Sequence, residues 1–116
     1  MKNKTEPLKK KNYDKSPEVI SFNRNEISKI LKIYGQMVAS GIWRDYGISS
    51  LKGQAIFSIF RRTTEYPIYM IIKNPEMSKR QGAYSIIAMD GQVLKRGHDL
   101  ATVLQIFNKK LIRAVT

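Results

Sequence analysis

The centre of this chain constrains its fold most, because apolar residues there occupy both the odd and the even positions. Residues 55–60 read Ala-Ile-Phe-Ser-Ile-Phe, residues 68–72 read Ile-Tyr-Met-Ile-Ile, and residues 83–89 continue in the same way. Short runs of this kind predict β-strands, whose side chains point alternately to the two faces of a sheet. A sheet with one solvated face would show polar residues at every second position. We therefore expect a sheet with two apolar faces, which the helices cover either one each or together on one face, leaving the other to a second chain.

Helical periodicity flanks this central region on both sides. Asn23 is a favoured N-cap and Glu26 follows three residues later, which is the arrangement of a capping box. Apolar residues then recur at helical spacing and Gly41 can end a helix, so we predict a helix over residues 24–40. Asp99 caps a second predicted helix, whose apolar residues share one face: Leu100, Val103, Leu104, Phe107, Leu111 and Ala114.

Extended segments fill the space between the two predicted helices. We assign strands to residues 42–48, 55–62, 66–73, 83–89 and 92–95, with a turn over residues 49–54 and a loop over residues 74–82. The Asp90-Gly91 pair lies between two apolar runs and predicts a hairpin with a type I′ turn. The order predicts an α+β fold, an antiparallel four- to five-stranded meander sheet flanked by an N-terminal and a C-terminal helix.

The first 18 residues differ in composition from the rest of the chain. We predict a disordered basic arm over residues 1–18 and a single α+β domain over residues 19–116, because the arm has too few apolar side chains to offset the entropy cost of ordering. The arm is either a solvated tail or a mobile segment that wraps onto phosphates. Its candidate phosphate contacts are three consecutive lysines: Lys9, Lys10 and Lys11.

The charge of the chain points to an anionic partner. The sequence has 21 Lys and Arg against nine Asp and Glu, a net charge of +12 and a pI of about 10.1, and most of the excess lies after residue 18. A compact domain with such an excess repels itself, so the excess favours binding to a polyanion such as nucleic acid. Because no helix-turn-helix spacing, zinc finger or basic zipper is present, RNA or the ribosome is favoured over sequence-specific binding to DNA.

The candidate phosphate contacts in the domain are cations near the ends of the predicted strands, since arginine suits bidentate contact with phosphate. They are Arg61, Arg62, Lys73, Lys79, Arg80, Lys95 and Arg96. Antiparallel pairing predicts Arg61 and Arg62 at one end of the sheet and the cations of residues 73–80 at the other. Lys95 and Arg96 precede a Gly-containing helix entry, which either offers free backbone N–H groups to a phosphate or only connects a strand to a helix.

Aromatic residues are the candidates for base stacking and for partner binding. Tyr66, Tyr69 and Tyr84 lie in predicted strands and can stack on bases, as sheet aromatics do in RNA-binding modules. The alternative places them in the core, and we favour it for Tyr69. Trp43, the sole tryptophan, can anchor a protein partner, although a single tryptophan more often belongs to the core.

Catalytic and metal-binding motifs are not recognisable in this sequence. The chain has no cysteine and one histidine, His98, beside Asp99. Neighbours at a helix start do not face each other, so a His98–Asp99 dyad is geometrically unfavourable and we expect no enzyme, no metal and no cofactor. No long apolar run or signal-type stretch is present, so we expect a cytoplasmic protein that does not enter the membrane.

Four segments of the sequence carry a family resemblance. They are Trp43-Arg44-Asp45-Tyr46, Phe60-Arg61-Arg62, Gln81-Gly82-Ala83-Tyr84-Ser85 and Leu94-Lys95-Arg96-Gly97-His98-Asp99-Leu100. Together they resemble a family of small bacterial proteins described only as a domain of unknown function, and the similarity runs over residues 19–107. The resemblance implies a single bacterial cytoplasmic domain and transfers no activity, ligand or partner.

Two function classes follow from these observations. The first is a non-catalytic nucleic-acid-binding protein, associated with RNA or the ribosome. The alternative is a protein–protein interaction module or dimeric adaptor that uses an apolar sheet face. If both helices lie on one face, the bare face is expected to form a homodimer, because monomers rarely tolerate a large exposed apolar patch.

Overall fold

The computed structural model describes residues 18–62 and 66–115 of the chain, with side chains up to residue 109. Two α-helices, five strands and a short 3₁₀-helix follow one another in this part of the chain. Their order is α2 (Arg24–Ala39), β2 (Asp45–Leu51), β3 (Gln54–Phe60), β4 (Tyr69–Lys73), η1 (Pro75–Met77), β5 (Tyr84–Ala88), β6 (Val93–Gly97) and α3 (Leu100–Val115). The predicted α+β fold, with a helix before and a helix after the sheet, is confirmed.

Both helices begin directly after the residues that the sequence predicts as N-caps, Asn23 and Asp99. The Asn23 side chain accepts a hydrogen bond from the Glu26 N–H (2.8 Å), and the Asn23 N–H donates to the Glu26 carboxylate (2.7 Å), which completes the capping box. At α3, the Asp99 carboxylate accepts bonds from the N–H and the hydroxyl of Thr102. Each cap satisfies a backbone donor that the first helical turn leaves free.

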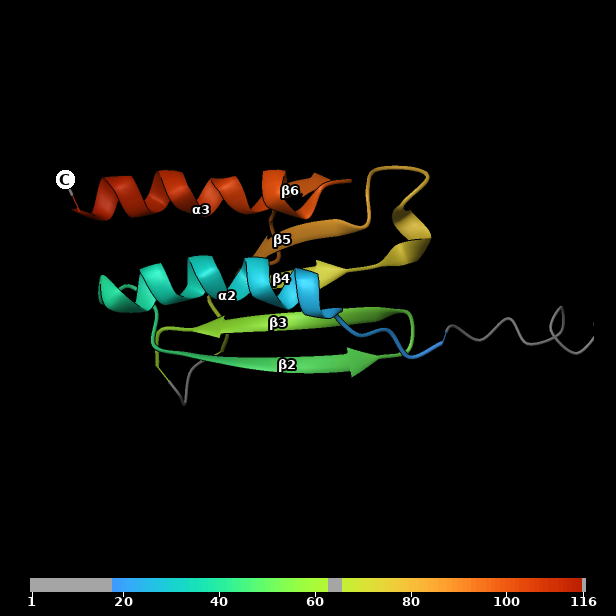
Figure 1. Ribbon diagram of the computed structural model, residues 1–116, viewed down its shortest axis with the longest axis horizontal. Coiled ribbons are helices and arrows are strands. Elements are labelled where there is room, and N and C mark those ends of the chain that lie inside the picture. Colours follow the sequence, from blue (N-terminus) through green and yellow to red (C-terminus); the bar gives the residue numbers. More distant parts are fainter. Residues whose placement is uncertain (1–17, 63–65, 116) are drawn as a thin grey trace, which may run out of the picture.

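The five strands form one antiparallel sheet in the order β2-β3-β4-β5-β6, as a meander predicts. Figure 1 shows α2 and α3 side by side over the same face of this sheet. The core therefore lies between the helices and that face, and its buried residues come from both layers: Ile30, Ile33, Met37, Trp43, Phe57, Ile59, Ile71, Ile86, Leu100, Val103, Leu104 and Phe107. Of the two arrangements that the sequence left open, the structure has both helices on one face.

The other face of the sheet, which we call the open face, carries the alternate residues of the same strands. Its large apolar side chains are half-buried by one another and by the adjacent strands: Ile56, Phe60, Met70, Ile72 and Ile87. Ser58 and Ser85 lie among them, so the open face is mixed in polarity and not continuously apolar.

The first strand and the turn after it lie later in the sequence than predicted. β2 begins at Asp45 instead of residue 42, and residues 49–51 belong to the strand instead of the turn. The register pairs Leu51 with Gln54, so Lys52 and Gly53 alone make the connection to β3. Gly53 has a φ of 84°, a conformation that glycine adopts without a steric cost, and this lets the turn be so short.

Other details differ from the prediction: β3 ends at Phe60 instead of residue 62, and β6 spans Val93–Gly97 instead of residues 92–95. β4 begins at Tyr69, after Pro67, whose missing N–H cannot donate to a strand ladder, so Tyr66 lies outside the strand. The hairpin at Asp90 and Gly91 is present, but the Gly91 N–H donates to the Ala88 C=O (2.8 Å). Met89 and Asp90 therefore form the centre of the turn, and Gly91 follows them with a φ of 89°, which is not the predicted type I′ geometry.

Candidate nucleic-acid interface

Helix α3 presents an uncharged or cationic surface along the side that faces solvent. Its buried side is made by Leu100, Val103, Leu104 and Phe107, at the spacing of an amphipathic helix. Its exposed side carries small residues, amides and a lysine: Ala101, Thr102, Gln105, Asn108 and Lys109. The sequence of α3, Leu100–Val115, contains no Asp or Glu, so the whole helix is free of negative side chains.

A groove of about 400 Å³ separates α3 from α2. Its floor is apolar, since Ile33 and Leu104 lie at the bottom. Its walls are cationic and amide-bearing. The polar lining residues are Lys29, Lys32 and Gln36 from α2 and Asn108 from α3. We call this groove the inter-helix groove.

A second groove, of about 300 Å³, lies on the other side of α3, against strand β6. Leu94 and Ile106 supply its apolar part, and its polar lining residues are Lys95, Thr102, Gln105 and Lys109. We call it the outer groove. α3 thus runs between two grooves, each lined by two lysines and two further polar uncharged side chains.

Neither groove is lined by a carboxylate, as far as the described residues go. The nearest acid in the sequence of α3 is its cap, Asp99, and hydrogen bonds from Thr102 lower the pKa of that carboxyl. Asp99 stays ionised at neutral pH and neutralises the positive dipole end of α3. The four groove lysines are exposed, and none is within ion-pair distance of a described carboxylate. Lys29 also lines a small polar hollow beside Asp99, and its charge helps to lower the pKa of that carboxyl.

A separate polar network ties the start of α2 to the sheet. The Glu26 carboxylate, in a residue that is 7% exposed, accepts hydrogen bonds from Lys73 Nζ (2.9 Å), the Tyr84 hydroxyl and the Asn23 N–H. Burial raises the pKa of Glu26, but the hydrogen bonds from Tyr84, Lys73 and Asn23 outweigh it and the pKa is lowered. Burial, followed by the bond to Glu26, raises the pKa of Tyr84 to about 12.

This network removes two residues from the predicted nucleic-acid and partner contacts. Lys73 forms an ion pair with Glu26 and its side chain is 18% exposed, so its charge is already balanced. Tyr84 lies on the helix-covered face and donates to the same carboxylate, so its ring is not free to stack on a base. Both corrections have one cause, the need of a buried carboxylate for donors.

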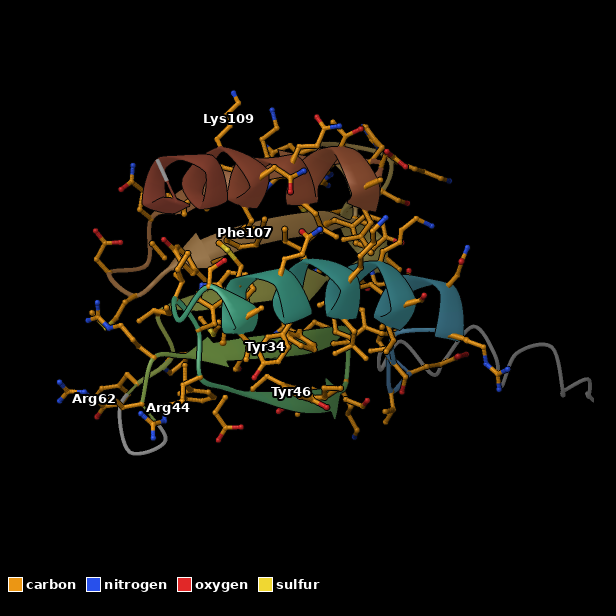
Figure 2. All side chains as sticks on the ribbon, turned by 60° about the vertical axis from the view of Figure 1, so that its left-hand side comes forward. Tyr34, Arg44, Tyr46, Arg62, Phe107 and Lys109 are labelled. Carbon is orange, nitrogen blue, oxygen red and sulfur yellow. The ribbon has the colours of Figure 1, made fainter. Side chains whose placement is uncertain are left out.

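The other predicted cations divide between opposite ends of the sheet. Arg61 and Arg62 are exposed just after β3, beside Arg44 at the start of β2, and Figure 2 shows Arg44 and Arg62 at this same end. Lys79 and Arg80 are exposed in the loop that follows η1, at the far end of β3, roughly 20 Å away at the usual rise per strand residue. The predicted separation of these two groups agrees with the described positions, and they do not form one patch.

Only one of the predicted domain cations lines a groove beside α3. Lys95 lies in the outer groove, whereas the half-buried Arg96 donates to the Gln81 side chain. Lys9, Lys10 and Lys11 lie outside the described residues. The structure therefore places Lys95 in one groove with Lys109, which the sequence analysis did not predict as a phosphate contact.

The aromatic candidates lie mostly in the core. Trp43 is 3% exposed, with its ring 4.9 Å from Phe107 in an edge-to-face contact, so it cannot anchor a partner at the surface. Tyr69 packs beside the same two rings. Tyr66, by contrast, is 83% exposed, and it follows Arg62 by four residues in the sequence. Of the three tyrosines considered for stacking, it alone is open to solvent.

The groove residues were missed because a sequence shows a charge but not what lies beside it. Lys29 and Lys32 follow helical spacing on the polar side of α2, which normally indicates only a solvated face. What turns them into a groove wall is the position of α3, which the sequence does not show. The detectable signal was the absence of any acid from residue 100 to residue 115 of the chain.

Other site types find no support in the described residues. No three His, Cys, Asp or Glu side chains of residues 18–62 and 66–115 lie together in a way that could hold a metal ion. Neither helix of the described chain has the length and the apolar character needed to cross a membrane. His98 borders a small polar hollow with Asn25 and Asp99 at the helix entry.

Comparison with known proteins gives a family but no activity. Residues 20–104 match the family described as "Protein of unknown function (DUF2794)". The match includes α2, the entire sheet and the first turn of α3, and it confirms the resemblance to an uncharacterised domain family. Neither the curated proteins nor the solved structures yield a match to the chain.

Proposed function

We propose that this chain, which belongs to the DUF2794 family of proteins of unknown function, is a non-catalytic nucleic-acid-binding protein that uses the surface around α3. The observation that carries the proposal is the pair of grooves on either side of α3, each lined by two lysines and by no carboxylate of the described chain. A polyanion that crosses α3 meets cations on both sides. The remaining exposed cations add a long-range attraction that steers such a partner to the protein.

The chemistry of the grooves suits a phosphate backbone with unpaired bases. Lysine ammonium groups contact phosphates, while the amides of Gln36, Gln105 and Asn108 can donate to and accept from base edges and ribose hydroxyls. The apolar floors favour the faces of bases over water. Such a site binds single strands with weak sequence preference.

RNA or a ribosomal RNA surface fits this site better than the major groove of DNA. α3 lies beside α2 in one layer, as Figure 1 shows, and does not project from the domain as a recognition helix does. RNA is read mainly through shape, single-stranded loops and the 2′-hydroxyl, for which shallow grooves suffice. A protein with this partner acts in the cytoplasm.

The test compares charge-matched variants in binding to a fluorescent single-stranded RNA of mixed sequence. Lys29→Gln/Lys32→Gln and Lys95→Gln/Lys109→Gln each remove two charges from one groove, and Arg61→Gln/Arg62→Gln removes two charges from the end of the sheet. We expect the groove variants to lose about tenfold or more in affinity and the control less than about threefold. The slope of log affinity against log salt should fall by about 1.4 for two lost phosphate contacts on a single strand.

Three results would contradict the proposal or redirect it. Absence of binding at low salt to RNA, to single-stranded DNA and to purified ribosomes would refute nucleic-acid binding. Equal losses in all three double variants would show that net charge, and not the grooves, determines affinity. Tighter binding to duplex DNA than to RNA would move the proposal to a different nucleic acid.

A second candidate function rests on the open face. Because both helices cover the same face, the half-buried side chains of Ile56, Met70 and Ile72 have no layer above them in the described chain. This arrangement is the one under which the sequence predicted a protein-interaction module or a homodimer. Variants Ile56→Lys and Met70→Lys would abolish an association through this face and would not weaken RNA binding.

A further inference from the structure

The two edges of the sheet differ in how they are protected against pairing with another strand. β6 carries a register shift opposite Ile86 and Ile87 and the cations Lys95 and Arg96, which are devices that discourage edge pairing. β2 has seven residues, pairs with β3 without a break in register, and contains no proline and no cation. An edge strand of this kind is a template for a further strand.

The backbone of β2 offers its hydrogen-bonding groups to the outside. At the end of the strand the Leu51 C=O accepts a hydrogen bond from the Ile20 N–H (2.9 Å), and Val19 pairs with Lys52. The Phe60 C=O points toward β2 and Phe60 pairs with Asp45, so along β2 the backbone groups of Asp45, Gly47 and Ser49 point toward β3. Those of Tyr46 and Ile48 point outward, and the Tyr46 N–H donates to the Asp45 carboxylate (2.8 Å). Of the N-terminal segment, the described residues contact only the last part of this edge, from Ser50 onward.

The exposed apolar side chains of the domain concentrate beside this same edge. Tyr46 and Ile48 of β2 are 40% and 47% exposed on the helix-covered side, although Tyr34 packs edge-to-face on Tyr46 (4.9 Å between ring centroids). Leu31 and Val38, seven residues apart on α2, are 37% and 39% exposed. Helical spacing places them on the side of α2 away from Lys29 and Gln36, which line the inter-helix groove.

This region is also the least charged part of a strongly basic molecule. From Tyr46 to Leu51 the strand has no ionisable group except the tyrosine, and α2 offers Leu31, Gly35 and Val38 on the adjoining side. Copies of a chain with a net charge of +12 repel one another everywhere else. An uncharged edge with apolar neighbours is therefore where a second copy can approach.

We propose that β2 pairs with β2 of a second copy, antiparallel and about a two-fold axis at Gly47, to form a continuous ten-stranded sheet. This register pairs residues 44–50 and ends before Leu51, whose C=O is bonded to Ile20. Ser50, at its end, also accepts from the Ser21 hydroxyl, so the central pairs of Tyr46 with Ile48 carry the contact. The register places Tyr46 of each copy opposite Ile48 of the other, and aromatic residues opposite β-branched residues stabilise a sheet. An isologous contact of this type is the commonest form of dimer interface.

The charges at the ends of the paired strands determine how the dimer responds to salt. Arg44 of each copy lies opposite Ser50 and close to Lys52 of the other copy, so like charges approach at both ends. Added salt screens this repulsion and should strengthen the dimer. The same salt weakens the binding of nucleic acid, so the two equilibria respond in opposite directions, and the dimer does not depend on the proposed function.

The absence of cysteine from the sequence allows a direct test of the register. Gly47→Cys introduces a single thiol at the two-fold axis, where the two residues would form a non-hydrogen-bonded pair with Cα atoms about 4.5 Å apart, within disulfide range. A Cβ at Gly47 meets only Phe60 Cε1, at 4.0 Å, so the domain tolerates the change. The control, Ser49→Cys, lies on the same side of the strand, but its two copies would be about 13 Å apart. Mild oxidation should crosslink Gly47→Cys and leave Ser49→Cys monomeric in denaturing gels.

A second pair of variants tests the contact without a crosslink. Ile48→Lys places a charge within the paired segment, and Leu51→Lys places the same charge on the same strand outside it, where Leu51 is 44% exposed. Sedimentation at moderate salt and tens of micromolar protein should give a dimer for the parent chain and for Leu51→Lys, and a monomer for Ile48→Lys. Circular dichroism melts establish that both variants fold.

Two results would overturn the inference. A parent chain that sediments as a monomer throughout this range, with no crosslink in Gly47→Cys, shows that β2 stays unpaired. A dimer that survives Ile48→Lys and does not crosslink at Gly47 shows that the copies meet elsewhere, with the open face as the remaining apolar surface.

Discussion

Glu26 is the residue on which three parts of the chain depend. Its carboxylate completes the cap of α2, forms an ion pair with Lys73 of β4 and accepts a hydrogen bond from the Tyr84 hydroxyl in β5. A buried carboxylate with three donors is stable in its ionised form, whereas the same group with a donor removed carries an unbalanced desolvation cost. The network therefore fixes the position of α2 on the sheet, and with it the wall of the inter-helix groove.

Removal of the Tyr84 hydroxyl should destabilise the domain measurably. We expect Tyr84→Phe to lower the free energy of unfolding by about 1–2 kcal/mol, because a hydrogen bond to a charged acceptor is lost inside a partly buried site. Tyr34→Phe is the matched control, since no hydrogen bond from the Tyr34 hydroxyl is present among the described contacts. Urea denaturation at pH 7 measures both. Equal values for the two variants would show that the Tyr84–Glu26 bond contributes nothing.

The pH dependence of the same network has a defined sign. The folded pKa of Glu26 lies below its ordinary value of 4.5, so its contribution to stability is present above that pH and is lost as the pH falls through the folded value. The folded pKa of Tyr84 is raised from 10 to about 12, so its contribution is present below pH 10 and is lost between pH 10 and pH 12. Tyr84→Phe should remove the alkaline loss attributable to this residue.

The sequence predicted one part of this network, the capping box of Asn23 and Glu26. The spacing of Asn23 and Glu26 predicted the capping box because the two residues lie within one helical turn. The bonds to Lys73 and Tyr84 span 47 and 58 residues, and no local pattern indicates them. For that reason the sequence analysis assigned Lys73 to nucleic acid and Tyr84 to base stacking, whereas both bond to Glu26 within the domain.

At the scale of elements, two glycines, Gly82 and Gly97, allow the backbone of the loop after η1 to lie close to the backbone of β6. A Cβ on Gly82, which has a φ of 109°, would lie 2.1 Å from the backbone carbon of Gly97. These glycines belong to two of the segments that carry the family resemblance, and Arg96 and Gln81 of the same segments share a hydrogen bond. The resemblance therefore rests in part on a close backbone approach that positions a loop.

The matched prediction compares two glycines that both have positive φ. Gly82→Ala should cost about 3 kcal/mol or more, because backbone strain adds to a clash with another backbone that cannot yield. Gly91→Ala, in the turn between β5 and β6, should cost about 1 kcal/mol, since its φ is 89° but no atom lies within 4 Å of the added Cβ. Thermal melts of both variants decide the point. Similar losses would mean that the loop moves away from Gly97 at little cost.

Element types were predictable here and element placement was not. Helical spacing predicted the two helices, and short apolar runs with turn signals between them predicted the meander, because those patterns are local. The start of β2, the turn at Lys52 and Gly53 and the three-residue loop ending at Gly91 depend on register, which neighbouring strands impose. The sequence also left open which face each helix covers, and that choice creates the open face and both grooves.

At the scale of the whole molecule, charge is distributed and not gathered into one patch. Arg61 and Arg62 lie at one end of the sheet, Lys79 and Arg80 at the other, and four lysines line the grooves beside α3. The composition alone predicted an anionic partner but could not locate the contact surface, since one net charge fits many distributions. Each groove beside α3 combines two lysines with an amide and apolar residues, and the proposed contact lies there because the two grooves flank one helix.

The N-terminal lysines provide the last test of this distribution. The described contacts of the N-terminal segment begin with Glu18, whose C=O accepts from the Gly53 N–H (3.0 Å), so deletion of residues 2–17 removes none of them. We expect the melting temperature to shift by less than about 2 °C and the affinity for single-stranded RNA to fall, because six lysines and only two acids are lost. A full-length variant with those six lysines changed to Gln should bind as weakly as the deletion if charge is the cause. A large drop in melting temperature would show instead that the arm packs on the domain, and an unchanged affinity would show that its charge takes no part in binding.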